Sequence, residues 1–272
     1  MRYRELPAGD RIPVIGLGTW RMGGGSEPDA TQNELVLHAI RTALKLGYTH
    51  IDTAEMYGGG HTEELIGEVI RDFDRESLFI TSKVWHTNLQ YPDVLRACEN
   101  SLGRLGTDYL DLYMIHWPNS GVPLEETFRA LNKLVEDGNV RHLGVSNFDL
   151  ALLTAARQLS IVPLVTDQVP YSVQNRTYAK NGVLAYCQEQ DMLLTAYTPL
   201  DKGRVDDLEK LNVIARRAGA TPMQVALSWL VSQPNIIAIP KSFNPDHLRQ
   251  NLEAVDLVLD EDELNILDHL AR

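Results

Sequence analysis

The feature that most constrains the fold is an alternation of strand-like and helix-like segments along the whole chain. Eight short apolar runs are typical of strands, and they lie at 14–20, 49–54, 78–84, 109–116, 141–147, 163–171, 193–200 and 235–242. Segments with apolar residues at i, i+3, i+4 and i+7 predict amphipathic helices at 34–47, 63–73, 92–106, 124–138, 149–159, 180–190, 206–218, 222–232, 245–255 and 260–271. Several of them close on a glycine, which helix ends favour: Gly47, Gly106 and Gly138. Eight alternations without a duplicated βαβαβ unit predict an α/β fold, a closed (β/α)8 or TIM barrel, rather than an open sheet.

The composition favours one globular, cytoplasmic domain spanning 1–272. Apolar residues make up 44% of the 272 residues, and no uncharged apolar run approaches the roughly 20 residues that cross a bilayer. The first residues, MRYRELPAGDRIP, interrupt any apolar stretch that a signal peptide needs. Cys98 and Cys187 lie in separate helix-like segments without metal-ligand spacing, so we expect buried thiols in a reducing compartment.

The charge balance argues against polyanionic partners. The 25 basic and 37 acidic side chains give a formal charge of −12, which repels nucleic acids and anionic membranes. Two glycine-rich clusters, at 23–31 and 58–60, are too short to be linkers between domains.

Polar residues stand at the ends of the predicted strands. Asp52 and Tyr57 follow the second strand, Lys83 ends the third and His116 ends the fourth. Each alone has an ordinary structural explanation, but the carboxyl ends of parallel strands meet at the face where barrels place their chemistry. The other strand ends carry Trp20, Ser146, Asn147, Gln168, Tyr197, Lys241 and Ser242.

The four side chains form a proton-transfer set. A free tyrosine titrates near pH 10, so donating its proton at neutral pH requires a nearby cation that stabilises the phenolate. We expect Lys83 to be that cation and to lower the pKa of Tyr57, and Asp52 to keep Lys83 charged. His116 would donate a ring N–H to an oxygen that gains negative charge.

The motifs resemble those of the aldo-keto reductase superfamily, in order and over essentially the whole chain. They are GLGTW (16–20), IDTAEMYGGG (51–60), SKVW (82–85), LDLYMIHWP (110–118), GVSNF (144–148), VTDQVPY around Gln168, AYTPL (196–200) and IPKS (239–242). The resemblance implies a (β/α)8 barrel that reduces aldehydes or ketones to alcohols with NADPH or NADH. Asp52, Tyr57, Lys83 and His116 match the family's catalytic four, with Tyr57 as the general acid.

The resemblance also implies where the cofactor lies. Ser146, Asn147 and Gln168 would bond the nicotinamide carboxamide, Tyr197 would stack on the ring, and Lys241 and Ser242 would meet the 2′-phosphate. A helix beginning near residue 245 would favour an anion there. The full expected set is Thr19, Trp20, Asp52, Ser146, Asn147, Gln168, Tyr197, Thr198, Pro199, Leu200, Lys241, Ser242, Phe243, Asn244, His247, Gln250 and Asn251.

One stretch departs from the family pattern. The family usually carries an arginine six residues after the lysine of IPKS and a glutamate three residues later, where this chain has His247 and Gln250. Arg249 is a poor substitute because it points to the far side of the helix. We therefore expect NADPH to be used and NADH to be accepted as well.

Three tryptophans follow the first, third and fourth strands and would form the substrate site with Tyr57 and His116. They are Trp20, Trp85 and Trp117, with Met22, Met56 and His86 expected nearby. Trp229, inside a helical pattern, is expected in the core. No tail follows the last predicted helix and the segment after Leu200 is brief, so we expect an open pocket for small carbonyl compounds.

Other functions are compatible with a barrel. Some members of the superfamily are cofactor-sensing subunits of larger assemblies, and an isomerase or lyase could use Tyr57 and Lys83 without nicotinamide. A metal hydrolase is disfavoured because His38, His50, His61 and His86 lack ligand-like spacing with carboxylates, so we expect no metal. The family habit implies a monomer or a weak homodimer.

Overall fold

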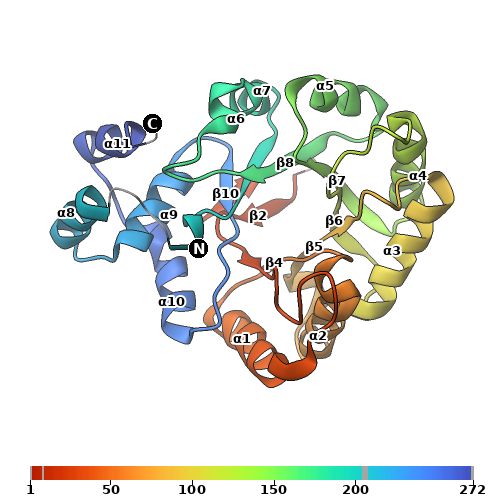
Figure 1. The fold of residues 1–272 in the computed structure, drawn as a ribbon, viewed down its shortest axis with the longest axis horizontal. Coiled ribbons are helices and arrows are strands. Elements are labelled where there is room, and N and C mark those ends of the chain that lie inside the picture. The colour runs from red at the N-terminus through yellow and green to blue at the C-terminus, as the bar shows by residue number, and fades with distance from the viewer. Residues whose placement is uncertain (1, 8, 204–207, 271–272) are drawn as a thin grey trace.

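Eight parallel strands form one sheet in sequence order, in a computed structural model that describes residues 2–7, 9–203 and 208–270. A parallel bridge between Ile15 and Ala238 brings the first strand against the last, supported by a hydrogen bond from the N–H of Gly16 to the carbonyl of Ala238 (2.9 Å). The predicted (β/α)8 barrel is therefore confirmed, and Figure 1 shows its helices around the sheet. The strands are β3 (Leu17–Gly18), β4 (His50–Asp52), β5 (Phe79–Val84), β6 (Leu110–Ile115), β7 (Val140–Ser146), β8 (Leu164–Pro170), β9 (Leu193–Tyr197) and β10 (Ile236–Ala238).

The helices lie where the sequence predicts them, except that one predicted helix is divided into two. The segment predicted as one helix at 180–190 forms α6 (Thr177–Lys180) and α7 (Val183–Glu189), because Gly182 adopts a φ of +89° and Asn181 Oδ1 accepts the N–H of Val183. Residues 206–207 and 271, which were predicted to be helical, lie outside the described residues. The other helices are α1 (Asn33–Leu46), α2 (His61–Ile70), α3 (Tyr91–Leu105), α4 (Leu124–Glu136), α5 (Leu150–Leu159), α8 (Leu208–Ala218), α9 (Pro222–Ser232), α10 (Pro245–Glu253) and α11 (Glu261–Asp268). Short 3-10 turns lie at Ala30–Gln32, Tyr57–Gly60, Arg75–Ser77, Asp201–Gly203 and Ala254–Asp256.

An antiparallel hairpin precedes the barrel, formed by β1 (Tyr3–Glu5) and β2 (Arg11–Pro13). It lies at the N-terminal end of the strands, where Asp10 Oδ2 is 2.8 Å from Nε2 of the buried His142 near the start of β7. The sequence did not predict it, because three-residue strands are too short to show an alternation and several of these side chains are charged.

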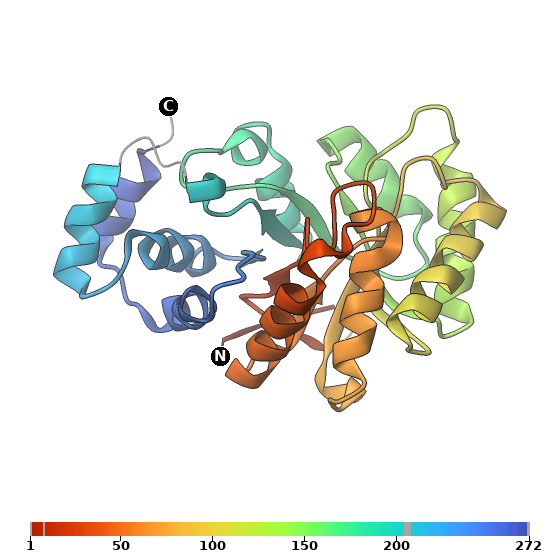
Figure 2. The same cartoon turned by 60° about the horizontal axis from the view of Figure 1, so that its bottom comes forward.

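The helices pack on the barrel through continuous apolar faces. Trp229 of α9 is 1% exposed, and its Nε1 donates to Asp268 Oδ1 (2.9 Å), so its predicted place in the core is confirmed. Cys98 and Cys187 are free and buried as predicted, and burial raises the pKa of both thiols to about 12. At one end of the molecule α8 and α11 lie side by side (Figure 2), joined by Arg217 of α8 and Glu263 of α11. Among the described residues, no helix is both long and apolar enough to cross a membrane.

His50, at the start of β4, makes the stability depend on pH. Its ring is 1% exposed, Nε2 lies 3.2 Å from Thr81 Oγ1, and burial lowers its pKa to about 4. The unfolded chain binds a proton at this residue near pH 6.5, whereas the folded chain does so only near pH 4. The contribution of His50 to the free energy of unfolding is therefore fully present above about pH 6.5. About 3 kcal/mol of that free energy is lost as the pH falls to about 4.

We expect His50→Gln to reduce this acid sensitivity, because glutamine keeps a polar group near Thr81 but does not titrate. Urea unfolding at about pH 7.5 and pH 4 should show the wild type losing about 3 kcal/mol more than the variant. Equal losses in the two proteins would show that His50 does not carry the pH dependence.

Candidate functional site

The polar side chains at the carboxyl ends of the strands converge as expected. Asp52 ends β4, Lys83 lies near the end of β5, His116 follows β6, and Gln168 lies near the end of β8. Because all these strands are parallel, the four side chains occupy one end of the barrel. The site is therefore built on four strands that are separate in the sequence. β4, β5 and β6 are neighbours in the sheet, and β8 lies opposite to β4 in the barrel.

A buried ion pair lies at the centre of the site. Lys83 Nζ is 2.6 Å from Asp52 Oδ1 and also donates to the Thr53 carbonyl (2.8 Å). The other oxygen of Asp52, Oδ2, accepts from Gln168 Nε2 (2.7 Å). Lys83 and Asp52 are 0% and 1% exposed, and burial lowers the pKa of Lys83 while the Asp52 charge opposes that shift. The pair connects three strands across the barrel.

Tyr57 points its hydroxyl toward this pair, 3.5 Å from Lys83 Nζ. Burial raises the pKa of the phenol well above its usual value, and the Asp52 charge adds to the rise. The expected acidification by Lys83 does not set the net direction of this pKa, because burial and the Asp52 carboxylate both raise it. The phenol keeps its proton throughout the neutral range.

His116 lies beside the phenol as a neutral imidazole. Its ring centroid is 5.6 Å from that of Tyr57 in an edge-on arrangement, and burial lowers its pKa to about 2. The backbone carbonyl of His116 accepts from Asn147 Nδ2 (3.1 Å), which ties it to the end of β7. A neutral imidazole still has one N–H to donate.

Hydroxyl and amide groups form a second cluster beside the ion pair. The Ser146 hydroxyl donates to the Gln168 carbonyl (2.7 Å), and Asn147 Nδ2 donates to Ser146 Oγ (2.9 Å). Asn147 has a φ of +63°, and its Oδ1 accepts from the Tyr197 hydroxyl (2.8 Å), which fixes that half-buried ring. The structure thus brings together four of the expected cofactor residues.

The remaining expected cofactor residues lie on three stretches, which follow β3, β9 and β10. Thr19 is buried, and its Oγ1 donates to the Asp52 carbonyl (2.8 Å), whereas Trp20 is 39% exposed. Lys241 is exposed, with Nζ 5.2 Å from the centroid of the Phe243 ring. Thr198, Pro199 and Leu200 directly follow β9; Ser242, Asn244, His247, Gln250 and Asn251 lie before or within α10, and Asn251 is only 5% exposed.

The first turn of α10 agrees with the departure seen in the sequence. Asn244 Oδ1 accepts the N–H groups of Asp246 and His247, and the His247 side chain is exposed. Arg249 is engaged elsewhere, with Nη1 3.0 Å from Asp246 Oδ1.

The tryptophans surround the phenol and the imidazole. The ring centroid of Trp20 lies 4.9 Å from that of Tyr57, and the centroid of Trp85 lies 5.1 Å from that of His116. Trp117 is 43% exposed at the rim. Of the residues expected nearby, His86 lies with its ring centroid 4.5 Å from that of Trp85 at a tilt of 56°, Met56 is partly buried, and Met22 is fully buried in the core. Met22 therefore lies behind the surface of the site.

The sequence reasoning missed Glu55. Its Oε1 accepts the N–H of Trp85 (2.5 Å) and Asn88 Nδ2 (3.0 Å), which holds the turn that carries Trp85. Burial raises the pKa of this carboxyl group. Its position two residues before Tyr57 was the only available signal, and nothing in the local pattern distinguished it from a solvated acid.

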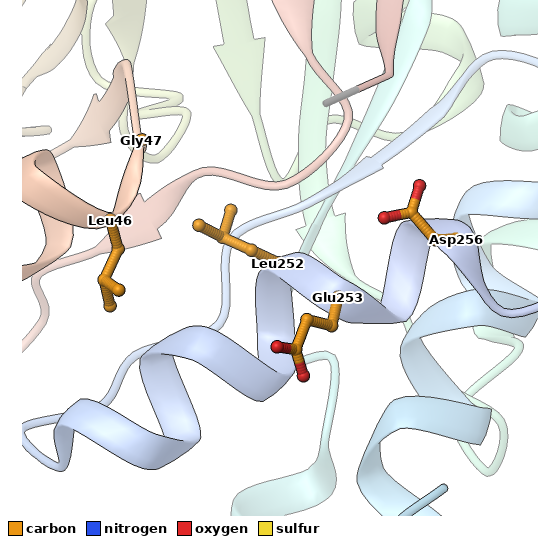
Figure 3. A pocket seen from close by; sticks show the side chains of 5 residues that line it. All are labelled: Leu46, Gly47, Leu252, Glu253 and Asp256. Atoms are coloured by element: carbon orange, nitrogen blue, oxygen red, sulfur yellow. The ribbon is translucent and has the colours of Figure 1, made fainter. Parts of the chain in front are cut away.

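Another cavity, of about 210 Å³, lies away from this chemistry. Figure 3 shows its lining, formed by Leu46, Gly47, Leu252, Glu253 and Asp256. It lies at the carboxyl end of α1, which in a βα unit is the end opposite to the carboxyl ends of the strands. It holds two carboxylates and no other titratable side chain. Within the described ranges, no group of three or more His, Cys, Asp and Glu side chains could hold a metal ion.

Comparison with known proteins gives consistent matches over nearly the whole chain. Residues 14–272 match the model of the aldo/keto reductase family. The methylglyoxal reductase YeaE of Escherichia coli (strain K12) is 40% identical over 263 residues, covering 94% of this chain and 90% of that protein. The crystal structure of the thermostable aldo-keto reductase Tm1743 with the inhibitor epalrestat is 50% identical, covers 100% of both chains and gives a TM-score of 0.98. An aldo/keto reductase of Klebsiella pneumoniae in complex with NADP and acetate is 38% identical, with a TM-score of 0.88 over 97% of this chain and 93% of that one.

We expect Lys83→Met to destabilise the protein, because it leaves the Asp52 carboxylate buried without its cation. Breaking one side of a buried pair costs about 3–5 kcal/mol. Adding Asp52→Asn should recover part of that loss, since the amide carries no charge. Urea unfolding of the two single variants and the double variant measures the coupling. Strictly additive losses would show that the two side chains do not stabilise each other.

Proposed function

Since the chain belongs to the aldo/keto reductase family, we propose that it reduces aldehydes and ketones to alcohols with a nicotinamide dinucleotide, Tyr57 being the proton donor. The observation that carries the proposal is the buried row of Asp52, Lys83 and Tyr57 with His116 beside the phenol. Such a row places a protonated phenol, a cation and a neutral hydrogen-bond donor around one position. We propose that residues 1–272 act as one catalytic domain in the cytoplasm.

The phenol donates the proton, and the ammonium stabilises the phenolate that remains. Bound reduced dinucleotide supplies the hydride that reaches the carbonyl carbon. Tyr57 gives its proton to the carbonyl oxygen, on which negative charge develops. Lys83 Nζ, 3.5 Å from the phenol oxygen, stabilises the phenolate as it forms. Asp52 holds Lys83 in place and charged, since its carboxylate accepts from Lys83 through one oxygen while Gln168 orients it through the other.

His116 orients the carbonyl group. Its pKa of about 2 keeps the imidazole neutral, so it acts as a hydrogen-bond donor to the carbonyl oxygen and not as a competing acid. Trp85, edge-on to this ring at 5.1 Å, limits its rotation. Trp20 and Trp117, both partly exposed, offer apolar surface to the rest of the substrate.

The second cluster fits the nicotinamide group. A carboxamide needs both donors and acceptors, which the Ser146 hydroxyl and the Asn147 and Gln168 amides provide. The half-buried Tyr197 ring, held by Asn147 Oδ1, offers a flat face for stacking. At the other end, Lys241 is an exposed cation just before α10, so we propose that NADPH is bound and that NADH is accepted because residue 247 is a histidine.

The open rim and the relatives favour small carbonyl substrates. The relative from Escherichia coli is named a methylglyoxal reductase, and the Klebsiella pneumoniae structure holds NADP. We propose that this chain acts on small aldehydes and dicarbonyl compounds of that kind. A spectrophotometric assay of NADPH oxidation with methylglyoxal tests the proposal, and a protein that binds NADPH without turnover would favour a cofactor-sensing role instead.

Replacing the phenol should separate binding from chemistry. Tyr57→Phe keeps the ring that Trp20 contacts but removes the acidic proton, so kcat for methylglyoxal reduction should fall by roughly 10²–10⁴-fold. The Kd for NADPH, measured by quenching of tryptophan fluorescence, should stay within about twofold. A variant with near-normal kcat would remove Tyr57 from the mechanism.

Residue 247 should set the cofactor preference. Arginine is charged at every working pH and can bind a phosphate through two N–H groups, whereas histidine is charged only in acid. His247→Arg should tighten NADPH by about 1–2 kcal/mol and leave NADH little changed. Arg249→Gln is the control, because Arg249 already pairs with Asp246 and its loss should affect neither Kd. Equal tightening of both cofactors would show that residue 247 does not contact the 2′-phosphate.

A further inference from the structure

We infer that Gly58, through close backbone contact with Gly23 and Gly25, is a positioning residue for Tyr57. These three glycines, here called the glycine clasp, come from the two glycine-rich clusters that stand out in the sequence. The inference rests on the proposed role of Tyr57 as proton donor. It assigns to the clasp the task of fixing the phenol relative to Lys83.

Gly58 directly follows Tyr57 and contacts the loop after β3. Its N–H donates to the carbonyl of Gly25 at 2.6 Å. A β-carbon on Gly58 would lie 2.5 Å from the carbonyl oxygen of Gly23, a backbone atom that cannot rotate away. Gly58 also has a φ of +60°, a conformation that favours glycine. Only a glycine at this position lets the two backbones approach so closely.

The loop that Gly58 contacts is itself fixed. The N–H of Asp29 donates to the carbonyl of Gly23 (2.8 Å), and Gly24 pairs with Pro28 in an antiparallel bridge. The hydroxyl of Thr62, at the start of α2, donates to the carbonyl of Met22. The clasp therefore joins two rigid segments, and neither can shift without the other.

Both segments carry side chains of the site. Trp20 lies at the start of the loop after β3, and its ring centroid is 4.9 Å from that of Tyr57. The phenol oxygen lies 3.5 Å from Lys83 Nζ, which is long for a hydrogen bond, so this weak contact does not by itself fix the phenol and the backbone at residues 57 and 58 must help to place it. A displacement of about 1 Å at a reacting group can cost about 100-fold in rate.

Gly58 and Gly59 form a matched pair for testing the clasp. Their φ angles are +60° and +59°, so an alanine at either position meets the same backbone strain. A β-carbon on Gly59 would meet nothing closer than 3.4 Å. Gly106, with a φ of +66° and no atom within 4 Å of its β-carbon position, gives a distant control at the end of α3.

We expect Gly58→Ala to lower kcat for methylglyoxal reduction by about 10- to 100-fold relative to Gly59→Ala. The Kd for NADPH, from tryptophan fluorescence, should be the same in both variants within about twofold. Gly59→Ala and Gly106→Ala should turn over at close to the wild-type rate. Equal kcat values for Gly58→Ala and Gly59→Ala would overturn the inference.

A double-mutant cycle shows whether the effect passes through the phenol. In the Tyr57→Phe background, assayed at high enzyme concentration, Gly58→Ala should cost nothing further, because the group that it displaces is gone. A full additional loss there would show general disruption and would overturn the inference. A wild-type kcat in Tyr57→Phe itself would overturn the proposed function, whatever residue 58 does.

Thr62→Val keeps the inference testable if Gly58→Ala does not fold. Valine has the shape of threonine and removes only the hydrogen bond to Met22. We expect a loss of kcat of about 3- to 10-fold, with an unchanged Kd for NADPH and no further loss in the Tyr57→Phe background. An unchanged kcat in a correctly folded Thr62→Val protein would contradict the coupling between the two segments.

Discussion

The ion pair between Asp52 and Lys83 is the interaction on which the site depends. Both side chains are almost completely buried, so neither charge is tolerable without the other. Gln168 donates a hydrogen bond to the second carboxylate oxygen, and the carbonyl of Thr53 accepts one from the ammonium group. The pair therefore fixes β4, β5 and β8 relative to one another. A cation is thereby held at the barrel mouth, in a position where an exposed lysine would be solvated and mobile.

The same pair explains an unexpected property of the phenol. A nearby ammonium alone would make Tyr57 more acidic, but here Asp52 cancels much of that charge and burial raises the phenol pKa. Tyr57 is thus protonated at neutral pH, and in the proposed reaction Lys83 acts when negative charge forms on the phenol oxygen. His116 is neutral for the related reason that burial disfavours a second cation beside Lys83. The site holds one cation, one acid and one neutral donor.

The loops around the pair divide into two kinds. Those that end β7 and β9 are tied to the sheet by side-chain hydrogen bonds through Asn147, while the loops at 20–29 and 57–62 meet largely through backbone atoms. Where two glycines meet through their backbones, no side chain can change its rotamer to make room for a larger residue. If the inference on Gly58 holds, the loop that carries Tyr57 accepts substitutions less readily than the loops that are tied by side chains.

The sequence by itself determined the barrel, the strand order and the residues at the strand ends, because period-2 and period-3.6 patterns and polar strand ends are local signals. The resemblance to the family also predicts that His247 stands where an arginine is usual. Only the tertiary structure decided how the groups interact: that burial and the Asp52 charge raise the pKa of Tyr57, that Met22 belongs to the core, that Glu55 holds the Trp85 turn, and that Gly58 contacts Gly23 and Gly25. Burial and distance between segments far apart in the chain fix these properties, and a local pattern contains neither.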